Sequence, residues 1–247
     1  MKLKNYFLLL LLCSFTIHAD SLPAYNPIVL NLATMYDFDA VRGNVKSIHS
    51  VIKNNKDEVT YESELALDKS GCIDSFYVKN FTIGYSMTMR KATEGLLGTE
   101  VSDMGNTSDI VLKLNSTCQI ISKTDKFGAL SYTYDKNGLV DKAINSKTGD
   151  VISSHKYNST GLPIKVEAYL SGEIYFENTL EYQNEKTKPF DYLLRIALKD
   201  KIFRVVKNLC QYDKNLNPTE CIITSVEDKN SNKVTSIQKA VIESIFY

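Results

Sequence analysis

Short extended segments alternate with polar turns along most of this chain, and this alternation constrains the fold more than any other feature. Residues 45–52, 59–67 and 72–78 are rich in β-branched and aromatic side chains, and the turn-forming stretches 54–57 and 68–71 separate them. Extended segments joined by short polar turns are typical of an antiparallel meander. We therefore predict a mainly β fold, a curved or split antiparallel sheet built from hairpins, with at most one or two short helices near the N-terminus.

The C-terminal half shows weak internal repetition. Residues 130–139, 155–163 and 210–218 each read as a strand ending in Tyr, an Asp or Asn entering a turn, and a Gly or Asn that closes it; residues 182–184 look like a shortened copy. The Asp or Asn side chain can accept a backbone N–H within the turn, and the Gly or Asn tolerates a positive φ. This spacing resembles the Tyr-Asp repeats of large bacterial surface and toxin-encasing proteins, which implies hairpins here.

Three other stretches are assigned from their local composition. Residues 21–35 carry two prolines and scattered apolar residues, which indicates a loosely packed arm or a short helix. Three glycines within residues 91–109 favour a long loop. The tail, residues 237–247, fits a helix or a strand, and we favour a strand. We divide the chain into a leader (1–19), an N-terminal β-rich part (20–122) and a C-terminal hairpin-repeat part (123–247), which can form one continuous domain.

The first nineteen residues have the order of a secretory leader. Lys2 and Lys4 precede an apolar run over residues 6–15, and the small residue Ala19 stands before an acidic start. The apolar run is too short to span a bilayer, so we expect cleavage after Ala19 and export. The alternative is lipidation at Cys13, which would anchor the chain to a membrane but would require a small residue in place of the preceding Leu12.

Cysteine usage fits an exported chain. Either processing route removes Cys13 from the thiol count and leaves four cysteines. An even number in an oxidising compartment predicts two disulfides, with three possible connectivities. We favour Cys210–Cys221, because these residues flank a turn-rich segment, together with Cys72–Cys118. A metal site is disfavoured because no Cys-x-x-Cys or paired His accompanies them.

The charge balance excludes several classes of partner. The chain has 29 basic and 29 acidic residues with the signs interspersed. Such a balance provides no basic field for nucleic acid and no polybasic stripe for anionic lipid, so we expect no nucleic-acid partner and membrane contact only through an anchor at Cys13. No metallopeptidase, nucleophile-elbow or phosphate-binding motif is present, and we expect no cofactor and no metal. His49 and His155, the histidines that follow the leader, are expected to be surface or structural residues.

One polar cluster is a candidate binding site. Asp37 and Asp39 stand two residues apart, which on a strand would place them on the same face, and Arg42 follows close by. Paired carboxylates can bind Ca²⁺ or serve glycoside hydrolysis, but a structural pairing or a turn cap is the commoner use. If any cluster in this sequence is functional, we expect it to be this one.

Taken end to end, the chain resembles a known family. The residues that carry the resemblance are Phe38-Asp39, Arg42-Gly43, Val45-Lys46, Gly71-Cys72, Cys118-Gln119, Asn137-Gly138, Tyr157, Gly161, Pro163, Cys210, Tyr212-Asp213, Asn217-Pro218 and Cys221. Together they are similar to the uncharacterised enterobacterial lipoprotein family typified by YnfC. The resemblance implies a bacterial envelope protein, lipid-anchored and without an assigned activity, and Leu12 departs from the pattern that the anchor needs.

These observations lead to three hypotheses of function. The first is a non-enzymatic, β-rich interaction or structural module in the periplasm, with an unidentified envelope component as partner. The second is a sugar- or lipid-binding envelope domain that uses exposed tyrosines; it requires the tyrosines to line a concave pocket. The third is an envelope hydrolase that depends on carboxylates such as Asp37 and Asp39.

Overall fold

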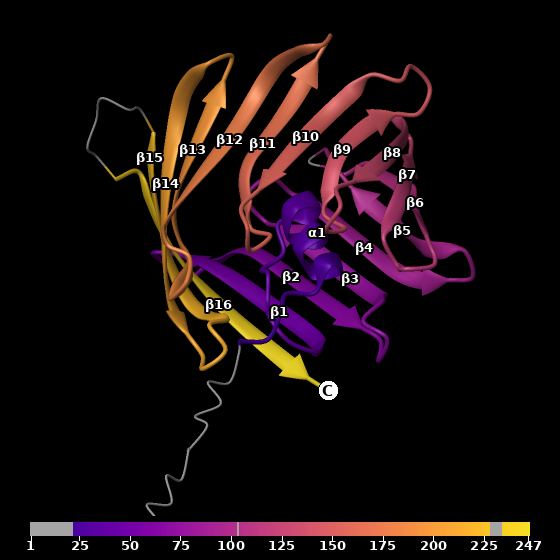
Figure 1. The fold of residues 1–247 in the computed structure, drawn as a ribbon. Helices are drawn as coiled ribbons and strands as arrows, with labels where there is room; N and C mark the ends of the chain where they lie inside the picture. Colours follow the sequence, from indigo (N-terminus) through magenta and orange to yellow (C-terminus); the bar gives the residue numbers. More distant parts are fainter. Residues whose placement is uncertain (1–21, 103, 228–233) are drawn as a thin grey trace, which may run out of the picture.

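The chain folds into a closed antiparallel β-barrel. The computed structural model describes residues 22–102, 104–227 and 234–247. Each strand pairs with the next along the chain, and β1 pairs with β16 to close the barrel (Figure 1). The predicted mainly β, antiparallel hairpin fold is confirmed, and closure of the sheet removes both of its edges. The strands are β1 Val45–Asn54, β2 Val59–Leu67, β3 Ile73–Asn80, β4 Tyr85–Ala92, β5 Gly95–Val101, β6 Thr107–Leu114, β7 Ile120–Asp125, β8 Gly128–Tyr134, β9 Val140–Asn145, β10 Val151–Tyr157, β11 Pro163–Leu170, β12 Glu173–Asn184, β13 Lys188–Leu198, β14 Lys201–Tyr212, β15 Pro218–Glu227 and β16 Ser236–Phe246.

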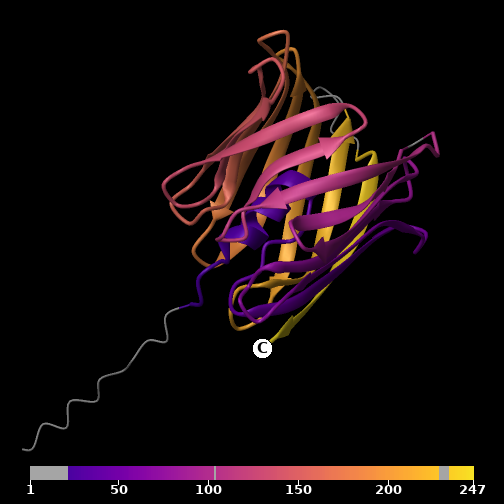
Figure 2. The ribbon, with the colours of Figure 1, turned by 90° about the vertical axis from the view of Figure 1, so that its right-hand side faces the viewer.

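One helix, α1 (Pro27–Tyr36), lies inside the ring of strands (Figures 1 and 2). Asn26 caps its N-terminus by accepting the Ile28 N–H at 2.9 Å, and Pro27 suits the first helical position because it has no N–H to satisfy. Val29 and Leu32 are fully buried. Of the two predictions for residues 21–35, the short helix is confirmed and the loosely packed arm is wrong.

The same five-residue turn occurs six times in the described chain. In each copy the first residue, Asp or Asn, donates its N–H to the carbonyl of the fifth and accepts the N–H of the fourth. Its side-chain Oδ1 also accepts the N–H groups of the third and fifth residues, which closes the turn from within. The copies span residues 54–58, 68–72, 115–119, 135–139, 158–162 and 213–217.

The fourth residue of each turn has a positive φ, but it is not always Gly or Asn. Gly71, Gly138 and Gly161 occupy this position in three copies, whereas Asp57 (φ 64°), Cys118 (φ 64°) and Leu216 (φ 60°) occupy it in the others. The prediction that Gly or Asn closes every copy is therefore wrong for residues 210–218. Because the hydrogen bonds to the first side chain fix the turn, a residue with a Cβ is held in this strained region.

Two of these turns hold α1 in the barrel. The Asn26 side chain donates to the Gly71 carbonyl at 3.4 Å. The Asn31 side chain, which is 4% exposed, donates to the Gly138 carbonyl at 3.0 Å and accepts the Val140 N–H at 2.9 Å. Both amide atoms of this buried side chain thus have partners on the barrel wall, so the helix is fixed in one position at this end.

The predicted loop over residues 91–109 is wrong, because most of the segment lies in β4, β5 and β6. Its glycines were read as turn signals, but Gly98 lies within β5. A Cβ at Gly98 would come within 1.8 Å of the Thr88 carbonyl oxygen, so the strands approach too closely there for any side chain. The tail is strand β16, as predicted. The proposed division at residue 123 falls within β7.

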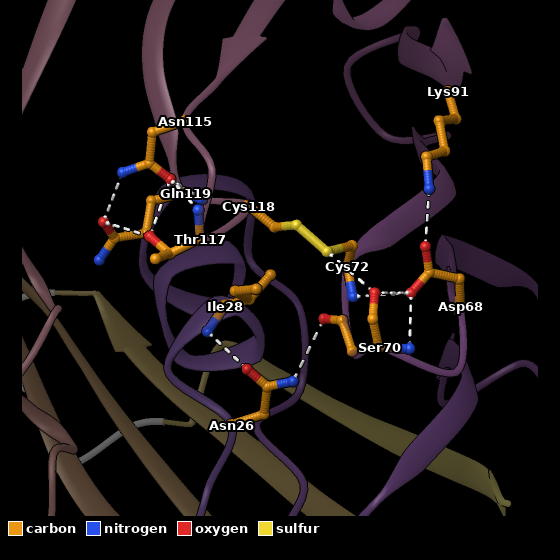
Figure 3. The surroundings of a disulfide bond; sticks show 11 residues. Asn26, Ile28, Asp68, Ser70, Cys72, Lys91, Asn115, Thr117, Cys118 and Gln119 are labelled. Atoms are coloured by element: carbon orange, nitrogen blue, oxygen red, sulfur yellow. Dashed lines mark hydrogen bonds and ion pairs between the residues drawn. A yellow bond between two sulfur atoms is a disulfide. The ribbon is translucent and has the colours of Figure 1, made fainter.

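Both predicted disulfides are confirmed. Cys210 and Cys221 are directly opposite each other on β14 and β15, with their Cα atoms 4.0 Å apart. Cys72 and Cys118 join two of the repeated turns, 46 residues apart in the sequence (Figure 3). Next to this second bridge, Asp68 accepts a hydrogen bond from the Lys91 ammonium at 2.6 Å, which keeps the pKa of Asp68 well below its usual value. Because the Cys72–Cys118 bridge joins two turns, it fastens the wall of the barrel at the end where α1 is held.

A barrel of sixteen strands is too wide to be filled by its own side chains alone. On the side of β1 to β7, α1 and large inward-facing residues such as Phe76, Met87 and Leu112 form a continuous buried core. A smaller cluster around Leu30 and Leu162 packs at the other side of the helix. Beyond these two clusters the lumen is not filled, and a cavity remains.

Candidate binding site in the barrel lumen

The cavity lies between the segment that follows α1 and the inward faces of β11 to β16. Its volume is about 310 Å³, within the range of pockets for small molecules. The helix end and the following segment form one wall, and alternate residues of the strands form the other. The lining residues used below are Asp37, Phe38, Asp39, Tyr61, Asn178, Leu180, Tyr182, Tyr192, Leu194 and Asn208.

Two of the three candidate residues, Asp37 and Asp39, line this cavity. They do not lie on a strand, as the sequence interpretation assumed. Asp37 is the C-cap of α1 with φ 55°, and this left-handed residue turns the chain away from the helix axis. Asp39 Oδ2 accepts a hydrogen bond from Ser50 Oγ of β1 at 2.5 Å, and the Asp37 carbonyl accepts one from Tyr61 Oη of β2 at 3.1 Å. The helix end thus presents both carboxylates to the lumen.

Arg42, the third candidate, lies elsewhere. Its guanidinium stacks over the ring of Tyr25, 4.2 Å from the centroid, and its backbone N–H donates to Asn217 Oδ1 at 2.7 Å. Asn217 belongs to the last of the repeated turns, so Arg42 helps to fix the chain after α1 to the barrel wall. It does not line the cavity with Asp37 and Asp39.

Both carboxyl groups are desolvated. Burial among the barrel strands raises the pKa of Asp37 and of Asp39 above the usual value, and the charge of Asp37 adds to the increase at Asp39. The hydrogen bond from Ser50 acts in the opposite direction on the pKa of Asp39. Asp37 retains exposed surface, but this surface lies within the lumen, where strands surround it. Among the described residues that line the cavity, none is Lys, Arg or His.

The opposite wall combines aromatic rings with amides. Tyr182 and Tyr192 pack edge to face with centroids 5.8 Å apart. Two amide oxygens of this wall, Asn178 Oδ1 and Asn208 Oδ1, are buried and accept no hydrogen bond within the described structure. Asn208 is 6% exposed, and its Nδ2 donates to the Phe190 carbonyl at 2.9 Å, which fixes the orientation of the amide. A buried acceptor without a partner is costly, so these oxygens favour an occupant that donates hydrogen bonds.

Sequence reasoning did not identify the amides. Asn178 has the same parity as Phe176, Leu180 and Tyr182 and interrupts this apolar series. An amide at an inward-facing strand position was the available signal, because a polar residue there needs either a partner or a ligand.

A second hollow adjoins the cavity. It has a volume of about 250 Å³ and shares Asp37, Ile52 and Tyr61 with the first. Its remaining lining residues include Asn80, Thr82 and Gln238, which lie near the ends of strands at the opposite end of the barrel from the turns that hold α1. This hollow provides an approach to the carboxylates from that end.

No cluster of three or more His, Cys, Asp or Glu side chains suited to a metal ion occurs among residues 22–102, 104–227 and 234–247. Ca²⁺ takes six to eight oxygen ligands, far more than the two carboxylates provide. The chemistry of the lumen is therefore that of hydrogen-bond acceptors, negative charge and aromatic faces.

A model of the UPF0257 family, described as an uncharacterised protein family, matches residues 1–245. The chain belongs to the UPF0257 family. The resemblance inferred from the sequence is thereby confirmed. Curated relatives include the UPF0257 lipoprotein YnfC of Salmonella dublin, which is 22% identical over 229 residues that cover 92% of each chain. The UPF0257 lipoprotein YnfC of Salmonella typhi is 21% identical over the same length and coverage.

Among solved structures, the UPF0257 chain is similar to a porin-like protein from Bacteroides uniformis. The identity is 10% and the TM-score 0.39, with coverage of 81% of this chain and 98% of that one. No helix among the described residues is long and apolar enough to span a membrane. The predicted leader, its cleavage after Ala19 and the alternative anchor at Cys13 lie outside the described residues.

Proposed function

We propose that this UPF0257 protein is an envelope protein that binds a small molecule in the lumen of its barrel. The observation that carries the proposal is the cavity of about 310 Å³, lined by two carboxylates, by Tyr61, Tyr182 and Tyr192, and by two unpartnered amide oxygens. A structural module gains nothing from a hollow of this kind, because filling it with apolar side chains would increase stability. Tyrosines around a concave cavity are what the second hypothesis, a sugar- or lipid-binding domain, requires.

The arrangement of Asp37 and Asp39 favours binding over hydrolysis. In glycoside hydrolases the two catalytic carboxyl groups flank the scissile bond, one as acid and the other as base or nucleophile. Here both carboxylates project from one short segment on one wall of the cavity. The opposite wall carries amides and phenols instead, which suits recognition of a ligand held between the two walls.

The distribution of charge supports a location in the aqueous part of the envelope. Several residues that alternate with the lumen-lining ones form ion pairs on the outer face of the barrel, which also carries exposed apolar residues such as Leu209 and Ile222. Lys165 meets Glu177 at 2.8 Å and Lys239 meets Glu220 at 2.8 Å. Barrels that span a membrane carry a continuous apolar outer band, which ion pairs at these positions interrupt. The lipoprotein names of the relatives support attachment to the envelope, and a soluble periplasmic form remains our expectation for this chain.

The proposal predicts that a neutral apolar dye enters the lumen. N-phenyl-1-naphthylamine should bind with an increase in fluorescence, and Leu194→Trp should weaken its affinity at least ten-fold because Leu194 lines the cavity. The matched control is Leu193→Trp, since neighbouring residues of a strand point to opposite faces. It should change the dye affinity by less than two-fold.

Fluorescence titration measures both affinities, and thermal unfolding establishes that each variant is folded. An equal loss of affinity in the two variants would show that the dye binds outside the lumen. The absence of any fluorescence increase with folded native protein would contradict the proposed function itself.

A further inference from the structure

We infer that the lumen of this barrel is built for a small organic cation, a ligand that carries a protonated primary amine. The inference rests on the proposed function and specifies its ligand class. Asp37 and Asp39 together with the unpartnered Asn208 carry it, because all three line the same cavity and none of their free oxygens has a cationic partner.

The first step is the uncompensated charge. Elsewhere in the described barrel a lysine neutralises one buried carboxylate: the Glu167 side chain is 9% exposed and lies 2.6 Å from the Lys165 ammonium. That lysine lowers the pKa of Glu167 to about 2. In the lumen, by contrast, Asp39 has only a hydroxyl donor, Ser50, and no Lys, Arg or His is among the described residues of the lining. A desolvated carboxylate is stabilised by pairing with a cation, which a ligand could supply here.

The second step concerns the hydrogen-bond donors that a ligand would bring to the acceptors of the lumen. An ammonium group has three N–H donors and no acceptor. The lumen offers it the oxygens of Asp37 and Asp39 on one wall, and the opposite wall holds the unpartnered, solvent-shielded Oδ1 atoms of Asn178 and Asn208. The Asn208 amide cannot turn its nitrogen toward the ligand without losing the hydrogen bond to the Phe190 carbonyl. A neutral alcohol could donate a single hydrogen bond and would leave the negative charge unpaired.

The third step is the aromatic lining. Rings of Phe38, Tyr61, Tyr182 and Tyr192 line the cavity with the acceptors. The face of an aromatic ring carries partial negative charge and attracts cations. Rings also take up the hydrocarbon body of an amine, so the lining can hold both parts of one ligand. An ammonium placed here would favour the ionised form of Asp37 and Asp39, against the burial that raises their pKa.

The test compares two probes of the same shape, 1-aminoadamantane, which is protonated at pH 7.5, and the neutral 1-adamantanol. Each is titrated into the native chain by calorimetry and by displacement of N-phenyl-1-naphthylamine. We expect the amine to bind at least ten-fold more tightly than the alcohol. In Asp37→Asn/Asp39→Asn, which keeps the shape of both side chains, the ratio of the two affinities should fall close to one.

The matched control is Glu181→Gln/Glu220→Gln, which removes the same net charge from the outer face of the barrel. It should retain the preference for the amine, because exposed charges are screened by solvent. The single variant Asp39→Asn serves as a second measurement if the double variant does not fold, and it should lower the preference at least three-fold.

The outcomes separate the inference from the proposed function. If the dye binds and both probes displace it equally, the inference is wrong and the proposed function stands. If the luminal and outer variants reduce the preference to the same extent, the preference reflects net charge and the inference is also wrong. If neither the dye nor either probe binds to the folded native chain, both the inference and the proposed function are wrong.

Discussion

Replacing Cys72 and Cys118 together with alanine should lower the free energy of unfolding by about 4 kcal/mol. The bridge closes a loop between residues 46 positions apart, and closing such a loop removes about this much conformational entropy from the unfolded chain. The bridge also fastens two of the turns at the end of the barrel that holds α1 (Figure 3). Urea denaturation of oxidised native protein and of the double variant measures the difference.

The matched control is the double alanine variant of Cys210 and Cys221. This bridge spans only 11 positions between strands that are already paired, so its removal should cost about 3 kcal/mol. The order of the two losses tests the loop-closure explanation. A larger loss for the short bridge than for the long one would contradict it.

Local structure was predictable from the sequence where it depends on local hydrogen bonds. Asp135 and Gly138 indicate a turn because the carboxylate accepts N–H groups two and four residues ahead, and the glycine takes a positive φ. The pairing of Cys210 with Cys221 followed for the same reason, since a turn between two strands brings their ends together. These features are decided within a few residues of chain.

Closure of the barrel was not predictable in this way. It depends on β1 and β16, whose paired residues Val51 and Val241 lie 190 positions apart with no local motif that links them. The glycines of residues 91–109 misled the interpretation for a related reason. Gly98 is required by the approach of the Thr88 backbone on the neighbouring strand, and a sequence pattern cannot distinguish this requirement from a turn.

The sequence indicated one wall of the candidate site but not the other. Asp37 and Asp39 stand out in the sequence because polar residues concentrated beside Gly43 are hard to explain by core packing. Their surroundings come from the far half of the chain: Tyr192 and Asn208 reach the same cavity only because the barrel closes. Arg42 was included for its proximity in sequence, but the structure uses it at the Asn217 turn. Proximity in sequence is a weak guide inside a barrel, where alternate residues of distant strands meet.

Acidification should destabilise the barrel through His155, by about 3 kcal/mol between pH 6.5 and pH 4. The His155 ring is buried beside Ser153, whose hydroxyl lies 3.1 Å from Nε2, while Nδ1 has no partner in the described structure. Burial lowers the pKa of His155 to about 4, and the charge of Asp141 opposes this only in part. The folded state therefore keeps the ring neutral while the unfolded chain takes up a proton near pH 6.5. Stability from this group is complete above pH 6.5 and is lost as the pH falls toward 4.

Urea denaturation of the native chain and of His155→Gln across this pH range tests the sign and the size of the effect. The difference in unfolding free energy between the two proteins should change by about 3 kcal/mol from pH 7.5 to pH 4, because glutamine cannot be protonated. Asp37 and Asp39 contribute with the opposite sign, since their raised pKa values favour the folded state at low pH, but this contribution is common to both proteins and cancels. The control is His49→Gln, because the His49 imidazole is 42% exposed beside Glu62. This variant should lose as much unfolding free energy on acidification as the native protein does. A difference between native protein and His155→Gln that does not vary with pH would show that the buried ring does not resist protonation.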